Sequence, residues 1–176
     1  MSKVSIPLRV DPRKMADRAA VLEDEIPLSS FARLTEALED VQGQVHLRIS
    51  FGRDEQRTVV AYSELDVVVK MVCQRCLDVV ELPIHSACEY AIVEPEASTQ
   101  HLPKSYDVLE VGEDPLDLLA LVEDELLLAL PIVPLHASED CQMLGSQDAE
   151  PEGKDESSPA SSPFSILAQL KRDSKV

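Results

Sequence analysis

The sequence predicts an α+β domain in which an antiparallel β-sheet core packs with a few helices. Residues 45–51 alternate apolar and polar side chains without a fault, which is typical of a strand with one buried and one solvated face. β-branched stretches follow between residues 58 and 93, and a leucine-rich segment at residues 115–130 carries a helix start signal. The 176 residues suit one domain with tails.

The N-terminal segment, residues 1–44, is predicted to form part of the main domain and to contain two helices. The first begins after Asp11-Pro12, with the aspartate as N-cap and the proline as the first helical residue. The second is capped by Ser29 or Ser30 and ends at Gly43. Its apolar residues recur at helical spacing, at Phe31, Leu34, Leu38 and Val41.

The first twenty residues are basic within an otherwise acidic chain. They contain five basic residues and two acidic residues, so this segment is a candidate contact for a phosphate-bearing partner. The basic side chains that we assign to such a contact are Arg9, Arg13, Lys14 and Arg18.

Residues 45–141 are predicted to form the β-rich core, which ends with the leucine-rich helix and the loop after it. Strands are expected at residues 45–51, 58–62, 65–73 and 79–93, with a tight turn at Ser63-Glu64. Pro83 places the last strand at a sheet edge or a bulge, because proline cannot donate a ladder hydrogen bond. Cys73 and Cys76 then fall in a turn between two strands.

The leucine-rich helix at residues 115–130 is the strongest helix signal. Asp114 is the expected N-cap, Pro115 the first helical residue, and Pro131 the stop. The expected buried stripe consists of Leu119, Val122, Leu126, Ala129 and Leu130, and further leucines widen it. The helix also carries three consecutive acidic residues, Glu123, Asp124 and Glu125. Adjacent helix positions project in different directions, so these carboxylates indicate a solvated, partner-facing surface rather than a shared metal site.

The C-terminal part divides into an acidic linker at residues 142–162 and an amphipathic motif at residues 163–176. The linker is rich in Glu, Asp, Ser and Pro, and such a composition buries too little apolar surface to fold, so we expect it to be flexible. In the motif, apolar residues at helical spacing are followed by two basic residues, and these candidate contacts are Phe164, Leu167, Leu170, Lys171 and Arg172. The motif either docks on the domain or binds a partner.

The charge balance restricts the partners. The chain has 33 acidic and 16 basic residues and a formal net charge of −17. Phosphate binding is driven by Lys and Arg, so the acidic body is a poor nucleic-acid surface and a partner attracted by charge should be basic. Plain solubility explains the acidity equally well.

No apolar run reaches the roughly 18–20 residues of a membrane helix, since the longest candidate, at residues 126–135, contains two prolines. The first ten residues lack the pattern of a secretory signal. We therefore expect a cytoplasmic protein with no membrane partner.

The cysteines raise three alternatives. Cys73 and Cys76 form a C-x-x-C pair, which can supply half of a tetrahedral zinc site, and His136 with Cys141 can supply the other half. Alternatively, Cys73 is a buried strand residue that behaves as a small hydrophobe, and His136 is a surface histidine. A thiol redox centre is the third interpretation, but it favours a pair at a helix N-terminus, whereas this pair lies between strands.

No other enzyme constellation is present, so we expect a protein without catalytic activity. The chain lacks a glycine-rich phosphate loop, a G-x-S-x-G elbow and an H-E-x-x-H motif, and it contains only five glycines. A zinc- or thiol-dependent enzyme centred on Cys73 and Cys76 stays as the alternative, together with a generic acidic interaction module.

Several segments, read together, resemble the YceD family of bacterial and plastid proteins. The resembling segments are residues 3–8 with Asp11-Pro12, residues 73–77, residues 116–131, residues 133–141 and residues 163–172. They occur in order along nearly the whole chain. Other branches of the family carry a second cysteine pair after the acidic helix, and this sequence offers His136 and Cys141 there instead.

The resemblance implies a role in the synthesis, processing or stability of 23S ribosomal RNA, without enzymatic activity. Combined with the acidity, it suggests an accessory protein of ribosome biogenesis that binds a basic ribosomal protein or a pre-50S assembly intermediate. Direct contact with 23S rRNA is the other route, and it would use the two basic ends of the chain.

Overall fold

The computed structural model describes residues 9–100, 102–137 and 141. The chain divides into two compact units, residues 1–144 and 145–176, and every described residue belongs to the first. The predicted linker at residues 142–162 and the motif at residues 163–176 therefore lie outside the described residues. The elements are β1 (Arg9–Val10), α1 (Pro12–Asp17), β2 (Val21–Pro27), the 3₁₀ turn η1 (Leu28–Ser30), α2 (Ala32–Glu36), β3 (Gln44–Arg53), β4 (Val59–Val72), β5 (Val79–Val93), β6 (Asp107–Glu110), β7 (Leu116–Asp117) and α3 (Leu118–Ala129).

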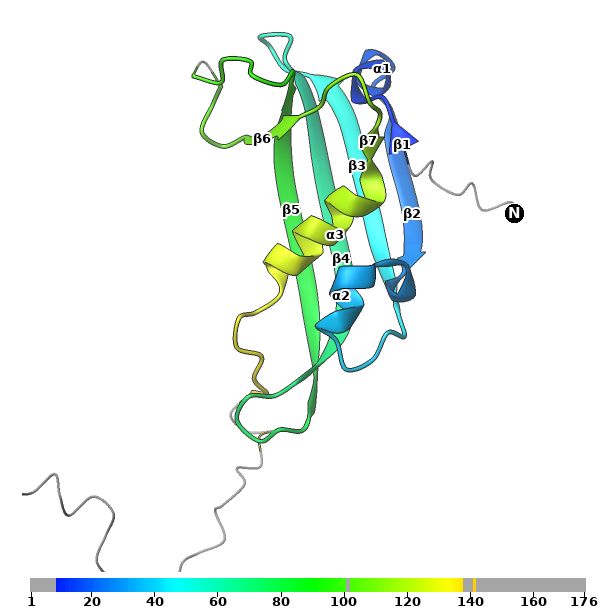
Figure 1. Ribbon diagram of the computed structural model, residues 1–176, viewed down its shortest axis with the longest axis vertical. Coiled ribbons are helices and arrows are strands. Elements are labelled where there is room, and N and C mark those ends of the chain that lie inside the picture. Colours follow the sequence, from blue (N-terminus) through cyan, green and yellow to red (C-terminus); the bar gives the residue numbers. More distant parts are fainter. Residues whose placement is uncertain (1–8, 101, 138–140, 142–176) are drawn as a thin grey trace, which may run out of the picture. The chain divides into compact units, whose positions relative to one another are not determined.

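The predicted α+β class is confirmed by a five-stranded sheet in the order β2-β3-β4-β5-β6. Strands β2, β3, β4 and β5 pair with their neighbours in antiparallel fashion. Strand β6 pairs in parallel with the last four residues of β5, residues 90–93. The short strands β1 and β7 form a separate antiparallel pair. Helices α2 and α3 lie across one face of the large sheet (Figure 1), so that face becomes the core.

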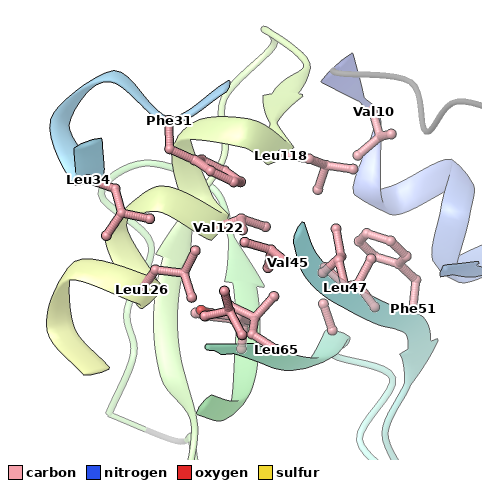
Figure 2. Packing of buried hydrophobic residues seen from close by; sticks show 14 of the residues in the cluster. Val10, Phe31, Leu34, Val45, Leu47, Phe51, Leu65, Leu118, Val122 and Leu126 are labelled. Atoms are coloured by element: carbon pink, nitrogen blue, oxygen red, sulfur yellow. The ribbon is translucent and has the colours of Figure 1, made fainter. Parts of the chain in front are cut away.

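The core follows from the alternation of side chains along the strands. Val45, Leu47 and Ile49 of β3 are almost completely buried, while the residues between them are exposed or half-buried. Figure 2 shows how side chains from the strands, from α3 and from the segment of α2 converge there, including Phe31 and Leu126. Fully burying a side chain of this size stabilises the fold by roughly 1.5–3 kcal/mol.

The predicted turn at Ser63-Glu64 is wrong, because β4 runs without a break from Val59 to Val72. Ser63 occupies an inward position and is 4 % exposed, so its small side chain fits the core without ending the strand. The alternation therefore continues through a polar residue. The edge strand β2, which we did not predict, pairs along its whole length with β3.

The strand at residues 79–93 is confirmed as β5, and Pro83 lies inside it rather than breaking it. Pro83 is opposite Val68 of β4, and on its other side β6 reaches only residues 90–93 of β5. In the described sheet, no strand therefore pairs with β5 beside Pro83 on the side away from β4. On that side a proline, which has no N–H group, removes no hydrogen bond between strands.

The helix predicted to run from Ser29 or Ser30 to Gly43 is much shorter. Both serines belong to η1, so neither caps a longer helix. Helix α2 runs only from Ala32 to Glu36, and its N-cap residue, Phe31, has no side-chain group that could cap it. The chain leaves the helical path because Glu39 N–H donates to Lys70 O at 2.8 Å and Asp40 forms an isolated bridge with Lys70. Phe31 and Leu34 are buried as expected, Leu38 is half-buried, and Val41 is 41 % exposed.

Helix α1 begins as predicted, with the Asp11 carboxylate accepting hydrogen bonds from the N–H groups of Arg13 and Lys14. Helix α3 begins three residues later than predicted, because Leu116 and Asp117 first pair with β1. The N-cap is consequently Asp117, which accepts a hydrogen bond from Ala120 N–H, and not Asp114. The predicted end of this helix is confirmed to within one residue.

The solvated face predicted for the acidic residues of α3 is wrong for two of the three. Glu123 and Glu125 are each 9 % exposed, whereas Asp124 is exposed. The Glu123 carboxylate accepts hydrogen bonds from the N–H groups of Arg33 at 2.6 Å and Leu34 at 3.1 Å. It thereby supplies the cap that α2 lacks in its own sequence. Glu125 accepts hydrogen bonds from Ser86 and Cys88 of β5.

No helix in the described part of the chain has the length and apolar character needed to cross a membrane.

Glu123→Gln should destabilise the protein by about 1.5–3 kcal/mol at neutral pH, since it weakens charge-assisted hydrogen bonds to α2. Burial opposes the charged form of Glu123, but Leu34 N–H and the Arg33 side chain outweigh it and hold the pKa of Glu123 below its ordinary 4.5. A lowered pKa in the folded state gives stabilisation that is present above the unfolded-state pKa and is lost as pH falls through the folded-state pKa.

Urea unfolding of the variant and the wild type at a series of pH values measures this effect. The difference between the two proteins should be complete above roughly pH 5 and should shrink as the solution is acidified. Asp124→Asn is the matched control, because Asp124 pairs with the same Arg33 but is exposed. It should cost about 0.5 kcal/mol or less; equal losses for both variants would contradict the capping role.

Candidate metal centre

The turn between β4 and β5 holds the first two candidate ligands. Cys73 follows the last residue of β4, and its N–H donates to Asp78 O at 2.8 Å while its carbonyl accepts from Leu77 N–H at 2.9 Å. Leu77 has φ 65°, a left-handed conformation that closes the turn within six residues. Both cysteine side chains point to the buried side, with exposed fractions of 0 % for Cys73 and 2 % for Cys76.

The other two candidate ligands come from the segment after α3. Leu130 ends the helix in an extended conformation, and the buried Pro134 brings the chain back to the turn. Gln74 N–H donates to Pro134 O at 2.9 Å, which joins the two segments through their backbones. His136 and Cys141 are thereby placed beside the cysteine pair.

The structure brings all four predicted metal ligands together. The sulfur atoms of Cys73, Cys76 and Cys141 and a ring nitrogen of His136 all lie within 4.8 Å of one another. Cys73 Sγ is 3.9 Å from Cys141 Sγ, and Cys76 Sγ is 3.3 Å from His136 Nδ1. Tetrahedral zinc with bonds of about 2.3 Å to sulfur requires sulfur atoms roughly 3.8 Å apart. The cluster therefore has the dimensions of a Cys₃His metal site.

Protonation differs sharply between the two cysteines of the turn. Burial opposes ionisation of Cys73, but the N–H groups of Cys76, His136 and Arg75 donate to its sulfur and lower its pKa to about 5. For Cys76, the Asp78 N–H favours the thiolate, whereas burial and the negative charge on the neighbouring sulfurs raise the pKa to about 11. Cys73 therefore offers a thiolate more readily than Cys76, and a cation that binds Cys76 would displace its proton.

The contacts around the cluster orient its ligands. His136 Nε2 lies 3.0 Å from Val79 O, an arrangement that turns Nδ1 toward Cys76 Sγ and makes it the candidate metal ligand. The Arg75 side chain donates to Cys141 Sγ at 2.8 Å and to His136 O at 3.2 Å. Arg75 therefore bridges the C-x-x-C turn to the segment after α3. Because both ring nitrogens of His136 are engaged, it is not the isolated surface histidine of the alternative interpretation.

Sequence reasoning missed Arg75 and Val79 in this arrangement. The position of Arg75 between the two cysteines was visible, but its distant acceptors, 61 and 66 residues along the chain, were not. The contribution of Val79 is a backbone carbonyl, which no side-chain pattern reveals.

Of the predicted basic contacts at the N-terminus, one is half-buried and bound within the domain, and the other three are exposed. The Arg13 guanidinium donates to Val111 O at 2.9 Å and Gly112 O at 3.2 Å. Lys14 pairs with Asp11 at 3.0 Å, and Arg9 lies 4.0 Å from the Asp117 carboxylate. Arg18 is exposed. The predicted contacts Phe164, Leu167, Leu170, Lys171 and Arg172 lie outside the described residues.

Fold and cluster together define a small α+β sheet protein whose central hairpin ends in a cysteine-histidine turn of the kind that can hold a structural metal. The family described as "Large ribosomal RNA subunit accumulation protein YceD" matches residues 62–171. A Haemophilus influenzae protein with the same description is 33 % identical over 173 residues, covering 98 % of this chain and 99 % of that protein. The chain belongs to the YceD family, as its sequence resemblance predicted. No solved structure matches it significantly.

Leu77→Gly should stabilise the protein by about 0.5–1 kcal/mol, because glycine adopts the left-handed conformation without the steric cost paid by leucine. Little burial is lost, since Leu77 is 64 % exposed. Leu128→Gly is the control: this leucine is 81 % exposed but helical, so its replacement should destabilise by roughly 0.5–1 kcal/mol. Thermal unfolding measures both, and a loss of stability in Leu77→Gly would contradict the turn geometry.

Proposed function

We propose that this chain is a non-enzymatic accessory protein of ribosome biogenesis that promotes accumulation of 23S ribosomal RNA by binding a basic ribosomal protein or a pre-50S assembly intermediate. The observation that carries the proposal is membership of a family whose description names large ribosomal RNA subunit accumulation. The formal net charge of −17 supports a basic protein as the direct partner.

The basic side chains of the N-terminal segment divide into two groups. Arg13 is half-buried and donates to backbone carbonyls inside the domain, so it is not free to bind phosphate. Arg9, Lys14 and Arg18 are exposed, although Arg9 and Lys14 each lie beside a carboxylate. Support for an indirect effect on RNA therefore comes from the acidity of the chain, because carboxylates repel phosphates.

Zinc in the Cys₃His cluster is the second part of the proposal. Three thiolates and an imidazole form a donor set that zinc prefers, and structural zinc sites have four protein ligands. Bound there, zinc would fix the β4–β5 turn to the segment after α3. Its role would be structural, because four protein ligands leave no position for a substrate.

The burial of the thiols supports this role over thiol catalysis. A catalytic or redox cysteine must be reached by its substrate, and such cysteines are partly exposed. Cys73 and Cys76 are almost completely buried, and their sulfur atoms face other cluster ligands. The zinc- or thiol-dependent enzyme is therefore the weaker alternative.

Metal titration of the full chain, purified under reducing conditions and stripped with a chelator, tests the zinc proposal. Cobalt should bind with one-to-one stoichiometry and give thiolate-to-metal charge-transfer absorption that zinc abolishes. Zinc at about a hundredfold excess over its Kd should raise Tm by roughly 5–10 °C. Cys76→Ser should lose most of both signals. Cys88→Ser, whose sulfur lies on β5 outside the cluster, should keep them; identical spectra from both variants would refute the site.

Affinity capture from growing bacterial cells tests the ribosomal proposal. Full-length tagged chain should enrich basic large-subunit proteins and pre-50S particles, and the protein partner should remain after ribonuclease treatment. Arg18→Gln should capture the same set, because the proposal does not require RNA contact through the basic segment. Tight binding of the purified chain to naked 23S fragments with a steep salt dependence would overturn the indirect route. Capture without any ribosomal component would overturn the function.

A further inference from the structure

The face of the large sheet opposite the helices presents an acidic surface. Outward positions of β2 to β5 carry the carboxylates Glu23, Glu25, Glu64, Asp66, Glu81 and Glu89. Within the described part of these strands, two permanently charged cations, Arg48 and Lys70, occupy outward positions among these carboxylates. Lys70 also pairs with Asp40 from outside this face, at 3.3 Å. The face therefore has a marked excess of negative charge.

The strand register concentrates this charge in two neighbouring rows. In one row, Glu23, Arg48 and Glu64 are direct neighbours on β2, β3 and β4. Arg48 lies 3.4 Å from Glu23 and directly opposite Glu64, so this row holds two carboxylates and one guanidinium. Directly opposite residues on antiparallel strands stand about 4.5–5.5 Å apart, close enough for their charges to interact.

In the next row, Glu25, His46, Asp66 and His85 occupy matching positions on four strands. His46 lies 3.6 Å from Glu25, and His85 lies 2.9 Å from Asp66. The carboxylates of the two rows, on Glu23, Glu25, Glu64 and Asp66, outnumber the single guanidinium of Arg48.

The same rows enclose a hollow of about 390 Å³. Four outward carboxylates, those of Glu23, Glu25, Glu64 and Asp66, line it together with the side chains of Arg48 and His46. A space of this size accommodates long cationic side chains, and a low-dielectric floor of buried strand residues strengthens their attraction to the carboxylates.

Apolar groups extend the surface on both sides of the hollow. Val68, 55 % exposed, and Pro83 line an adjoining hollow of about 320 Å³ that shares His46 and Asp66 with the first. Tyr62 of β4, 40 % exposed, lies on the same outward face as Glu64, Asp66 and Val68. Lysine and arginine can pack their aliphatic stems on such groups, and their cationic heads can lie over a tyrosine ring.

We propose that this open sheet face binds an extended lysine- and arginine-rich segment of a partner protein, with its cationic heads in the hollow between β2 and β4. This inference rests on the proposed function, which makes the partner a basic protein, and it names the surface and the chemistry that recognise that partner. The excess of carboxylates disfavours RNA on the same face, because phosphates would be repelled.

Binding of a short fluorescein-labelled peptide of alternating arginine and serine to the full chain tests the proposal by fluorescence anisotropy. A peptide of alternating glutamate and serine should not bind. Glu64→Gln combined with Asp66→Asn should weaken binding of the arginine peptide roughly five- to tenfold. Glu113→Gln combined with Asp114→Asn removes the same charge from exposed positions outside the sheet and should change Kd by less than about twofold.

Arg48→Gln guards against loss of folding as an explanation. Removing this cation makes the face more negative, so the peptide should bind roughly two- to threefold more tightly, which a misfolded variant would not do. Equal weakening by the two double variants, or no weakening by either, would overturn the proposal. Tight binding of a labelled 23S RNA fragment to the chain in the absence of peptide, weakened by Glu64→Gln with Asp66→Asn, would also overturn it.

Capture from cells with the same double variants separates this inference from the proposed function. If Glu64→Gln with Asp66→Asn still captures the ribosomal proteins that the wild type captures, the assigned face is wrong and the function stands. If the arginine peptide requires Glu64 and Asp66 but the wild type captures no ribosomal protein, the face stands as a basic-segment site and the proposed function fails.

Discussion

The register between β4 and β5 is the constraint on which the rest of the molecule depends. These strands pair over fourteen positions, from Val59 opposite Ile92 to Val72 opposite Val79. Side chains alternate between faces with a period of two, so a slip of one residue would turn the core outward and the carboxylates inward. The last pair of this register, Val72 opposite Val79, also fixes the position of the cysteine turn that joins these two residues.

Helix α3 packs on the core through apolar side chains and binds α2 and β5 through buried carboxylates. Its apolar residues Leu118, Val122 and Leu126 are almost completely buried. Its two buried carboxylates reach sideways, Glu123 to the start of α2 and Glu125 to Ser86 and Cys88 of β5. A buried charge is tolerated when it accepts several hydrogen bonds, and these contacts satisfy both. The buried carboxylates of this helix thus serve internal attachment, whereas six other carboxylates lie on the open sheet face.

Local signals predicted the elements whose stabilising contacts are local. The alternation from Val45 to Phe51, the Asp11 cap and the Pro131 stop depend on neighbouring residues, and each matches the structure. The errors arose where distant contacts decide. Because Leu116 and Asp117 pair with β1, α3 begins later than predicted. The hydrogen bond from Glu39 N–H to Lys70 O shortens the second helix. Likewise, the four cluster residues could be proposed from residue type, but Arg75 and the carbonyl of Val79 required the fold.

The separation of the cluster residues along the chain has a thermodynamic consequence. Cys73 and Cys141 are 68 residues apart, and the whole of β5, β6, β7 and α3 lies between them. An ion held by both would act as a cross-link, and a cross-link that closes a long loop stabilises mainly by reducing the entropy of the denatured ensemble. The C-x-x-C pair can keep its ion in the unfolded chain, whereas His136 and Cys141 are brought to it only by folding. The stability gained from such an ion would therefore come from the long-range pair alone, and a rearrangement that moved those two residues closer to the turn in sequence would lessen it.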